Sequence, residues 1–568
     1  TVASGAGADV ITTQSGDYSL SVDAGAGADG ITTVGAQLTS ADTIDGGADT
    51  DTITLSANSA TIVDADFDNI SNVEKFTTAD GTNSVTLGTK ADDSGLATVT
   101  GGTGVDTINA SAFAGALTIT SGAGADVITT QSGDYNLSVD SGANNDSLTV
   151  TATTLTEDDT IDAGTGTDTI TLSANSATIV DADFTNIDNI EKLTTADGTN
   201  SLTLGTKAAD SGFTTVTGGT GADTINASDF DGALTINAGN GADVITSQSG
   251  AYNLSIIAGT GADSVTVSVA NFTSSDTVLG GTGTDTLIFD AATTKVDSHF
   301  SEINTFEKLT LGNGTNSITL GTVAANAGFA TVTGSAGADT IDATNFDGAL
   351  TVLSGSGGND TITLGTASGQ ITVGDATNQW DSSDTFTGGA GTGDVLLLGD
   401  DSQTIVDLDF TNVTLIEKLT TGDGTNSLTL GTKADNSTLK TVTGGGGVDT
   451  INASAFTAVL TISSGGGNDV ITTQAGALAL SVDAGANDDT INVVGANLTD
   501  ADTIAGGANT DSIVLTADSA TIIDADFDNI SGVEKFTTAD GTNSVTLGTK
   551  ADDSGLATVT GGGGVDTI

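Results

Sequence analysis

Short runs in which apolar and polar residues alternate recur along the chain. In D-T-I-T-L (residues 51–55) and N-S-L-T-L (residues 200–204), Ile and Leu fall on one side of the run and Thr or Ser on the other. A period of two is typical of β-strands that bury one face. Turn-like pieces such as A-D-G-T-N-S separate the runs. The pattern therefore predicts an all-β protein made of many short strands.

The chain repeats itself with a period of about 117 residues. The dipeptide Glu-Lys recurs at spacings of 117, 116, 110 and 117 residues, with its glutamate at Glu74, Glu191, Glu307, Glu417 and Glu534. We divide the chain into a partial repeat (1–100), repeats 101–217 and 218–333, a shortened repeat (334–443), repeat 444–560 and the start of another (561–568). Because the chain begins and ends within a repeat, we expect it to be a section of a longer array.

Within a repeat, a Gly-rich bend followed by Asp recurs about every 20 residues, as at Asp106, Asp126, Asp146 and Asp168. A step of this length fits one coil of a parallel β-solenoid, whose coils stack about 4.8 Å apart. The absence of proline agrees with this fold, because inner coils must donate hydrogen bonds to both neighbours. We therefore expect a β-solenoid of stacked coils. The repeat length also allows an alternative, a row of tandem β-sandwich domains.

The composition is strongly acidic and argues against several classes of function. The chain holds 74 acidic residues against 11 lysines and no arginine, which gives a net charge of −63. Such a polyanion is a poor partner for nucleic acid. No apolar run approaches the roughly 18 residues needed for membrane insertion. The one histidine, His299, occurs in a single repeat and is paired with no nucleophile, so no enzyme is expected.

The repeated aspartates point to a bound cation. Equivalent residues of successive coils lie above one another, so the bend aspartates would form a column of carboxylates. Like charges about 5 Å apart repel by roughly 0.8 kcal/mol in water, and several times more near a protein surface. A hard cation between coils would remove this repulsion and would stabilise a chain that has no cysteine for disulfides.

Ca²⁺ is the natural candidate for that cation. It takes about six to eight oxygen ligands in flexible geometry, and glycine lets backbone carbonyls turn toward the ion through positive φ. Zn²⁺ is a poor fit to a chain with no Cys and one His. Mg²⁺ demands stricter octahedral geometry and tends to keep its waters.

The predicted calcium ligands fall into three groups. The first is the aspartate of each Gly-rich bend: Asp9, Asp29, Asp51, Asp106, Asp126, Asp146, Asp168, Asp223, Asp243, Asp263, Asp285, Asp339, Asp360, Asp394, Asp449, Asp469, Asp489, Asp511 and Asp566. The second is an acid just before the glycines: Asp23, Asp45, Asp140, Asp162 and Asp483. The third comprises glycines whose backbone would face the ion: Gly102, Gly104, Gly219, Gly221, Gly445 and Gly447.

The bends also resemble a known family. The pattern G-G-x-G-x-D-x-U-x, with U a large apolar residue, is the nonapeptide of RTX (repeats-in-toxin) calcium-binding β-rolls. It is matched fully by residues 101–109, 218–226, 280–288 and 444–452, and in degenerate form by 121–129 and 258–266. The resemblance implies several Ca²⁺ ions and type I secretion. RTX β-rolls repeat the motif about every nine residues, whereas the step here is about twenty, so we expect calcium along one edge of the coils.

These observations together predict an extracellular, calcium-stabilised structural protein. The phrase around Glu-Lys resembles RTX-type bacterial surface-layer proteins and giant surface adhesins. We therefore expect a surface layer or filament in which the chain's partner is another copy of itself, with cell-surface polysaccharide as a further candidate partner. Two alternatives stay open: the rod-like stalk of a giant adhesin, and a solenoid whose outward Thr ladders bind ice or polysaccharide.

Three smaller features are interpreted as structural. The phrase D-A-D-F (residues 64–67) is read as a solvated turn around a buried Phe, with a second cation site as the alternative. The glutamate of each Glu-Lys pair is expected at the surface. Tyr18, Tyr135 and Tyr252, which fall at steps of 117 residues, are expected to be packing residues.

Overall fold

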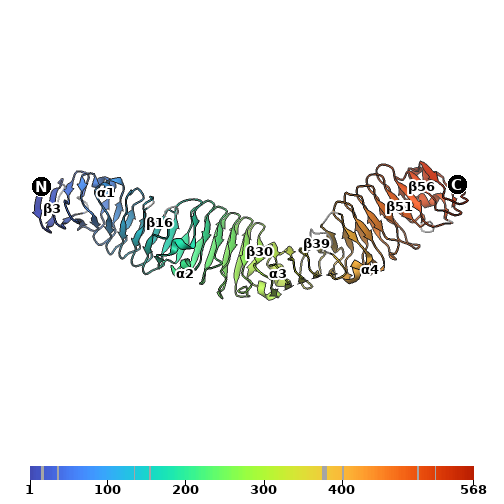
Figure 1. The fold of residues 1–568 in the computed structure, drawn as a ribbon, viewed down its shortest axis with the longest axis horizontal. Coiled ribbons are helices and arrows are strands. Elements are labelled where there is room, and N and C mark those ends of the chain that lie inside the picture. The colour runs from blue at the N-terminus through green and yellow to red at the C-terminus, as the bar shows by residue number, and fades with distance from the viewer. Residues whose placement is uncertain are drawn as a thin grey trace. The chain divides into compact units, whose positions relative to one another are not determined.

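The computed structural model describes residues 1–13, 18–34, 38–133, 135–151, 155–373, 380–399, 402–494, 498–518 and 520–568. The chain forms two compact units, Thr1–Thr286 and Leu287–Ile568. Within each unit, short strands lie side by side in successive coils (Figure 1). Paired strands run parallel, so that Ile108 lies beside Ile128, and Ile128 beside Leu148. The fold is therefore the expected parallel β-solenoid, and the alternative of tandem β-sandwiches is wrong.

Repeat 101–217 shows how a coil is built. Strands that precede the Gly-rich bends pair in one sheet: β11 (Thr98–Thr100), β13 (Thr118–Thr120), β15 (Ser138–Asp140) and β17 (Thr160–Asp162). Strands that follow the bends pair in a second sheet: β12 (Thr107–Asn109), β14 (Val127–Thr129), β16 (Ser147–Val150) and β18 (Thr169–Leu172). The bends therefore stack along one edge of the coils, called here the bend edge. The segments that lead back to the first sheet lie along the other, the loop edge.

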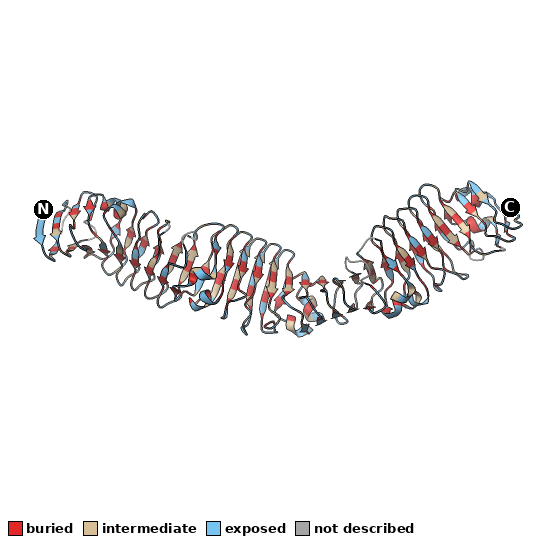
Figure 2. Ribbon diagram, in the orientation of Figure 1, coloured by how far each residue is buried: buried red, intermediate tan, exposed pale blue. Residues whose placement is uncertain are grey.

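The core is a stack of apolar side chains between the two sheets. Ile108, Ile128 and Leu148 lie in register and are at most 2% exposed. Their neighbours along each strand are exposed or half-buried, which produces the alternating colours along the strands in Figure 2. Burying one such side chain contributes about 1.5–3 kcal/mol. Hydrophobic packing thus explains the strands but gives no reason for acids at the bend edge.

The two sheets exchange roles at the end of the repeat. The strands involved are β19 (Thr178–Ile179), β20 (Ile187–Asp188), β21 (Lys192–Thr194), β22 (Ser201–Thr203), β23 (Thr215–Thr217) and β24 (Thr224–Asn226). The first sheet ends with β20, while the second continues from β18 through β21 to β23. A new sheet begins with β19, β22 and β24. The sheet that followed the bends thus precedes them in the next repeat. The bends of that repeat therefore lie between this sheet and the new one.

A short 3₁₀-helix and a short α-helix mark each exchange of sheets. The 3₁₀-helices are η2 (Asp64–Phe67), η4 (Asp181–Phe184), η5 (Asp297–Phe300), η6 (Asp407–Asn412) and η8 (Asp524–Phe527). The α-helices are α1 (Thr89–Asp93), α2 (Thr206–Asp210), α3 (Thr322–Asn326), α4 (Thr432–Asn436) and α5 (Thr549–Asp553). Among the described residues, none of the helices has the length and apolar character required to cross a membrane.

The D-A-D-F phrase of residues 64–67 holds its junction together. Phe67 is buried and packs edge-on against the ring of Phe76, with centroids 5.5 Å apart. One carboxylate oxygen of Asp64 accepts the N–H groups of Gly88 and Ala91 at the start of α1, at 2.7 and 3.0 Å. Its other oxygen accepts the N–H of Lys90 at 3.2 Å. The phrase is thus a turn around a buried Phe, with Asp64 capping the next coil.

The shortened repeat 334–443 departs from this plan. Its strands are β35 (Thr331–Thr333), β36 (Thr340–Asp342), β37 (Thr351–Leu353), β38 (Thr361–Thr363), β39 (Gln370–Val373), β40 (Thr385–Thr387), β41 (Val395–Leu398) and β44 (Lys418–Thr420). β36, β38 and β40 form one sheet, and β35, β37, β39, β41 and β44 the other. The first two bends lead from the sheet of β35 to the sheet of β36. The third, at residues 388–394, leads back from β40 to β41 and therefore lies on the loop edge.

Candidate metal centre

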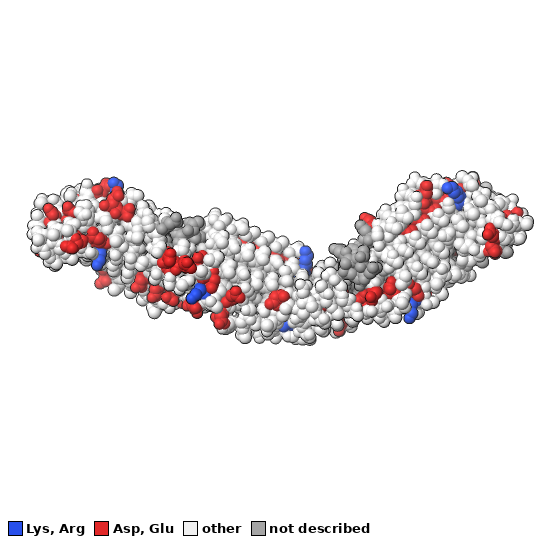
Figure 3. Space-filling model, in the orientation of Figure 1, with Lys and Arg blue, Asp and Glu red and all other residues white. Residues whose placement is uncertain are grey.

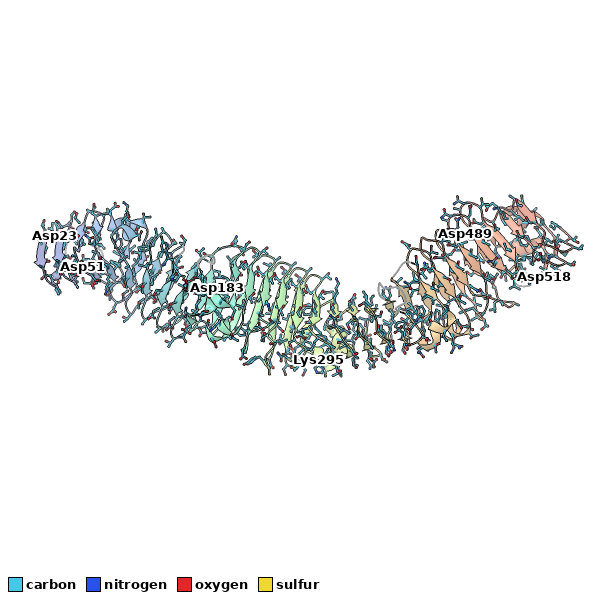
Figure 4. All side chains as sticks on the ribbon, in the orientation of Figure 1. Asp23, Asp51, Asp183, Lys295, Asp489 and Asp518 are labelled. Atoms are coloured by element: carbon cyan, nitrogen blue, oxygen red, sulfur yellow. The ribbon has the colours of Figure 1, made fainter. Side chains whose placement is uncertain are left out.

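The bend aspartates form hydrogen-bonded columns. The backbone N–H of Asp106 donates to Oδ1 of Asp126 one coil further on, at 2.7 Å, and Asp126 donates in the same way to Asp146. Bonds of 2.6–2.9 Å of this kind connect Asp9, Asp29 and Asp51; Asp106, Asp126, Asp146 and Asp168; Asp223, Asp243, Asp263 and Asp285; Asp339 and Asp360; and Asp449, Asp469, Asp489 and Asp511. Figure 4 labels two members, Asp51 and Asp489.

The second oxygen of many column carboxylates is buried without a hydrogen-bond donor. This holds for Oδ2 of Asp29, Asp51, Asp146, Asp168, Asp243, Asp263, Asp489 and Asp511, all at most 4% exposed. Asp9 and Asp566 are half-buried. A buried charged oxygen without a partner costs several kcal/mol unless it is neutralised. The columns therefore need either protons or a cation.

Burial has a direct effect on these carboxyl groups. It raises the pKa of Asp146, Asp360 and Asp489 to about 7, and that of Asp243 to about 6. The backbone N–H from the preceding coil opposes part of this rise, and the neighbouring column carboxylates add to it. Without a cation, the interior of a column therefore takes up protons near neutral pH.

The first glycine of four bends lies where a carboxylate oxygen and a carbonyl oxygen approach each other closely. A β-carbon on Gly101 would lie 2.7 Å from Oδ2 of Asp106 and 2.1 Å from the carbonyl oxygen of Ser121 in the next coil. The same pair, a carboxylate and a carbonyl oxygen, surrounds the equivalent point at Gly218, Gly334 and Gly444. Carboxylate and carbonyl oxygens are the ligands that Ca²⁺ takes in proteins. The residues present thus fit calcium.

The other predicted glycines serve close packing. A β-carbon would lie 2.0–2.5 Å from a carbonyl oxygen of the preceding coil at Gly102, Gly104, Gly219, Gly221, Gly445 and Gly447. Their φ angles are not positive, unlike those of Gly122 (+102°) and Gly124 (+146°) in the next bend. The expectation that positive φ explains these six glycines is therefore wrong. They are required because the coils approach each other closely.

The acids just before the glycines lie outside the columns. Asp23, Asp140, Asp162 and Asp483 are exposed and Asp45 is half-buried. Each is a strand residue next to a buried apolar residue, so the period of two turns its side chain outward. Asp140 and Asp162 lie side by side in register, and Asn189 Nδ2 donates to Oδ1 of Asp162 at 2.8 Å. Their part in calcium binding remains a prediction. Figure 3 shows how acidic the visible surface is and how few lysines it carries.

Two residue types that the sequence interpretation missed close the columns. At one end, Asn83 donates its backbone N–H and its Nδ2 to Oδ1 of Asp106, at 2.9 and 2.8 Å. At the other, the N–H of Asp168 donates to Oε2 of Glu191 at 2.7 Å. The expectation that the Glu-Lys glutamates lie at the surface is therefore wrong for Glu191. The signal was present, since Glu191 directly precedes strand β21 as Asp168 directly precedes β18.

The shortened repeat also corrects one predicted position. The N–H of Asp360 donates to Asp384 at 2.9 Å, so Asp394 does not continue the column of Asp339 and Asp360. Asp394 instead accepts the N–H of Gly369 at 2.7 Å, on the loop edge.

Tyr18 was also misjudged, since it is 67% exposed, and Tyr135 and Tyr252 are each 36% exposed. His299 has a local role, because its Nδ1 lies 3.1 Å from the N–H of Val296.

The columns contain no dense cluster of acids. Within the described ranges, no three His, Cys, Asp or Glu side chains converge on one point. An ion would therefore be held by one or two carboxylates together with backbone carbonyls, two kinds of oxygen that lie close together near Gly101. Repeated buried carboxylates along one edge of a parallel solenoid define a cation-binding repeat protein.

Comparison with known families agrees with this class. The family model of the RTX calcium-binding nonapeptide repeat (4 copies) matches residues 38–61, 151–176, 209–229, 322–347, 352–368 and 461–477. These segments include the bends of Asp51, Asp168, Asp223, Asp339, Asp360 and Asp469. Searches of curated proteins and of solved structures found no match. The chain thus contains several RTX-type calcium-binding repeats, which support Ca²⁺, bound as several ions, as its cofactor.

Proposed function

We propose that this protein is an extracellular structural protein whose fold is locked by calcium and which assembles with copies of itself into a surface layer or filament. The observation that carries the proposal is the set of buried column oxygens without donors, such as Oδ2 of Asp146, Asp243 and Asp489. These oxygens tie the stability of every regular repeat to a cation from the surroundings.

The chain's own cations are too few to replace calcium. Eleven lysines face 74 acidic residues. Lys90 pairs with Asp68 at 3.0 Å, but both side chains are more than 40% exposed, and an exposed pair contributes about 0–1 kcal/mol. The charge in the columns must therefore be neutralised from solution.

The concentration of calcium would then decide where the chain folds. Extracellular calcium modules bind with Kd values of about 10⁻⁴–10⁻³ M. Sites of this strength fill outside the cell and stay empty in the cytosol. Each site adds about 1.4 kcal/mol when calcium is ten times its Kd. RTX repeat proteins are typically exported by type I secretion, and a chain that folds after export suits that route.

Repeated surfaces support self-assembly. Residues 73–102 and 533–562 are identical over thirty positions. Both segments contain the same elements, such as α1 and α5. A surface that recurs along one chain can make the same contact several times with a second chain, which favours periodic assemblies.

The proposal is tested by circular dichroism and sedimentation velocity of the full chain. In millimolar CaCl₂ at pH 7.5 we expect a β spectrum and species larger than a monomer. In EGTA at the same pH we expect loss of β structure and a monomer, with Mg²⁺ failing to restore either signal. A chain that is folded and monomeric in both buffers contradicts the proposal. A chain that needs calcium to fold but stays monomeric favours the adhesin stalk.

A further inference from the structure

The glutamate of each Glu-Lys pair occupies a constant place in the fold. The last bend aspartate before it donates its backbone N–H to Oε2 of the glutamate at 2.7–3.0 Å in four pairs: Asp51–Glu74, Asp168–Glu191, Asp394–Glu417 and Asp511–Glu534. These four glutamates are buried or half-buried. A surface charge would have no reason to take this position at four junctions.

The glutamate is also the last carboxylate of its column. In the next coil the corresponding place belongs to Ala97, whose N–H donates to the backbone oxygen of Glu74 at 2.9 Å rather than to its side chain. The second carboxylate oxygen of Glu74, Oε1, accepts no hydrogen bond in the described structure. It lies 3.9 Å from the point where a β-carbon on Gly95 would sit.

The gap between the last aspartate and the glutamate contains further oxygens. Oδ2 of Asp51 is fully buried and has no donor. It lies 2.8 Å from the position that a β-carbon on Gly46 would occupy. The carbonyl oxygen of Asn72, in the coil of Glu74, lies 2.0 Å from the same position. Asp168 and Asp511 have the same buried, unpartnered Oδ2. An aspartate oxygen and a carbonyl oxygen thus lie close together here, and the carboxylate of Glu74 reaches the same aspartate through its backbone N–H at 2.8 Å.

We propose that Glu74, Glu191, Glu417 and Glu534 are calcium ligands, each of which adds one site beside the bend aspartate that donates to it. The inference rests on the calcium-locked fold proposed above. Two carboxylates and a carbonyl are a stronger donor set for Ca²⁺ than a carboxylate alone, because the ion then gains a second negative charge. Since the glutamate precedes a strand of the sheet that passes from one repeat to the next, an ion here stabilises the junction between repeats.

Replacement of glutamate by glutamine separates a ligand role from a structural one. The amide oxygen of glutamine can still accept the N–H of the last aspartate, but the negative charge is lost. The variant carries Glu74→Gln, Glu191→Gln, Glu417→Gln and Glu534→Gln in the full chain. A matched control carries Glu157→Gln and Glu302→Gln, which change exposed glutamates.

The bound calcium is counted by equilibrium dialysis followed by elemental analysis. We expect the variant to bind about four ions fewer per chain than the parent, and the control to bind as many as the parent. Thermal unfolding supplies a second measurement. In calcium the melting temperature of the variant should fall. In EGTA it should stay the same or rise, because a negative charge next to a buried aspartate has been removed.

Each contrary result has a distinct meaning. A variant that binds as many ions as the parent overturns the glutamate sites and leaves the calcium-locked fold intact. A variant that is destabilised equally in calcium and in EGTA shows a structural role and also overturns them. A parent chain that binds no calcium in the millimolar range contradicts the proposed function itself. The single variant Glu191→Gln, with an expected loss of one ion, keeps the test valid if the fourfold variant folds poorly.

Discussion

Repeats 101–217 and 334–443 are built from the same bends but place them differently. In the regular repeat the aspartates follow one another at steps of 20, 20 and 22 residues, and all four lie in one column. In the shortened repeat Asp360 follows Asp339 at a similar step, but the next bend aspartate, Asp394, comes much later in the chain. The segment from Asp360 to Asp394 makes about one and a half coils, with β38, β39 and β40 between them. It therefore moves Asp394 to the opposite edge.

Because Asp394 lies on the opposite edge, a different aspartate follows Asp360 in the column. Asp384 takes the place after Asp360, and both of its oxygens have donors, the N–H groups of Asp360 and Asp381, each at 2.9 Å. Oδ2 of Asp146, at the corresponding depth of the regular column, has no donor. The regular column thus needs a cation where the shortened one is satisfied by its own backbone. The comparison indicates that the edge of the coil on which a bend falls, and not its motif alone, decides which aspartates can share an ion.

The shortened repeat also contains an aromatic cluster around Trp380. Trp380 is 4% exposed and lies edge-on to Phe410 at 4.8 Å and near Phe386 at 6.3 Å. The regular repeat has the pair Phe184 and Phe213 at its junction, with centroids 5.1 Å apart. The two repeats should therefore respond differently to acid, to calcium and to loss of an aromatic ring.

The largest expected effect comes from pH in the absence of calcium. The pKa of Asp146 and Asp489 is raised from 3.8 to about 7 by burial. A raised pKa in the folded state stabilises the fold fully below the unfolded value and loses this effect as pH rises through the folded value. In EGTA, stability should therefore be greatest near pH 4 and fall steadily up to about pH 7.5. In calcium the trend should reverse, because protons compete with the ion.

Hydrogen exchange with peptide mapping distinguishes the two repeats in this experiment. Between pH 5 and 7.5 in EGTA, protection should fall across all bends of residues 101–172. In the shortened repeat the fall should centre on the bends of Asp339 and Asp360, since burial raises the pKa of Asp360 to about 7. Equal stability in EGTA at pH 5 and pH 7.5 would falsify the view that buried carboxylates without a partner make the stability of the columns depend on pH.

The next effect is the loss of the ring that is specific to the shortened repeat. Trp380→Ala should cost about 3–5 kcal/mol, because it leaves a cavity beside Phe410 and Phe386. The loss should be similar in calcium and in EGTA, since the described ring contacts of Trp380 are with phenylalanines and not with the column. Urea unfolding monitored by circular dichroism in both buffers measures it.

The matched variants are Trp380→Phe and Phe213→Ala. The first keeps an aromatic ring and should lose less than half as much stability. The second creates the equivalent cavity in the regular repeat, so its effect on exchange should appear near α2 and not near β40. If Trp380→Ala leaves the protection of β40 and β41 unchanged, the ring does not support that junction.

The column itself could be predicted from the sequence. A regular step, a glycine bend and an aspartate in constant phase place Asp106 and Asp126 above one another in any parallel solenoid. Calcium followed from charge and from the RTX resemblance. The exchange of sheets could not be predicted, because K-L-T in β21 and T-I-N in β24 have the same alternation. Which sheet a strand joins depends on contacts with the neighbouring coils, and not on its own pattern.

Two wrong predictions from the sequence, for Glu191 and Asp394, could have been avoided from the spacing of these residues along the chain. Glu191 follows Asp168 by one coil, so its place in the column was accessible. It was missed because the adjacent lysine suggests a surface charge pair. The position of Asp394 followed from its long separation from Asp360, but the presence of a glycine bend suggested another member of the column. In both cases the phase of the coil was more informative than the residue type.

The smallest expected effect tests the comparison most directly. Asp146→Asn removes a charge from a column interior and should reduce bound calcium by one or two ions per chain, with a loss of about 1–3 kcal/mol in calcium. Asp384→Asn keeps an acceptor for the N–H of Asp360 but loses one for Asp381, so it should cost about 1 kcal/mol and no calcium. Equilibrium dialysis and urea unfolding in calcium measure both.

The change in the free energy of unfolding in EGTA distinguishes the two aspartates further. Asp146→Asn should leave the calcium-free chain at pH 7.5 unchanged or more stable, because the raised pKa of Asp146 shows that its charge opposes folding there. Asp384→Asn should have the same effect in both buffers, because the two hydrogen bonds of Asp384 involve no ion. If Asp384→Asn instead lowers the calcium count as much as Asp146→Asn, the shortened repeat binds ions in the same way as a regular one, and coil phase does not select the ligands.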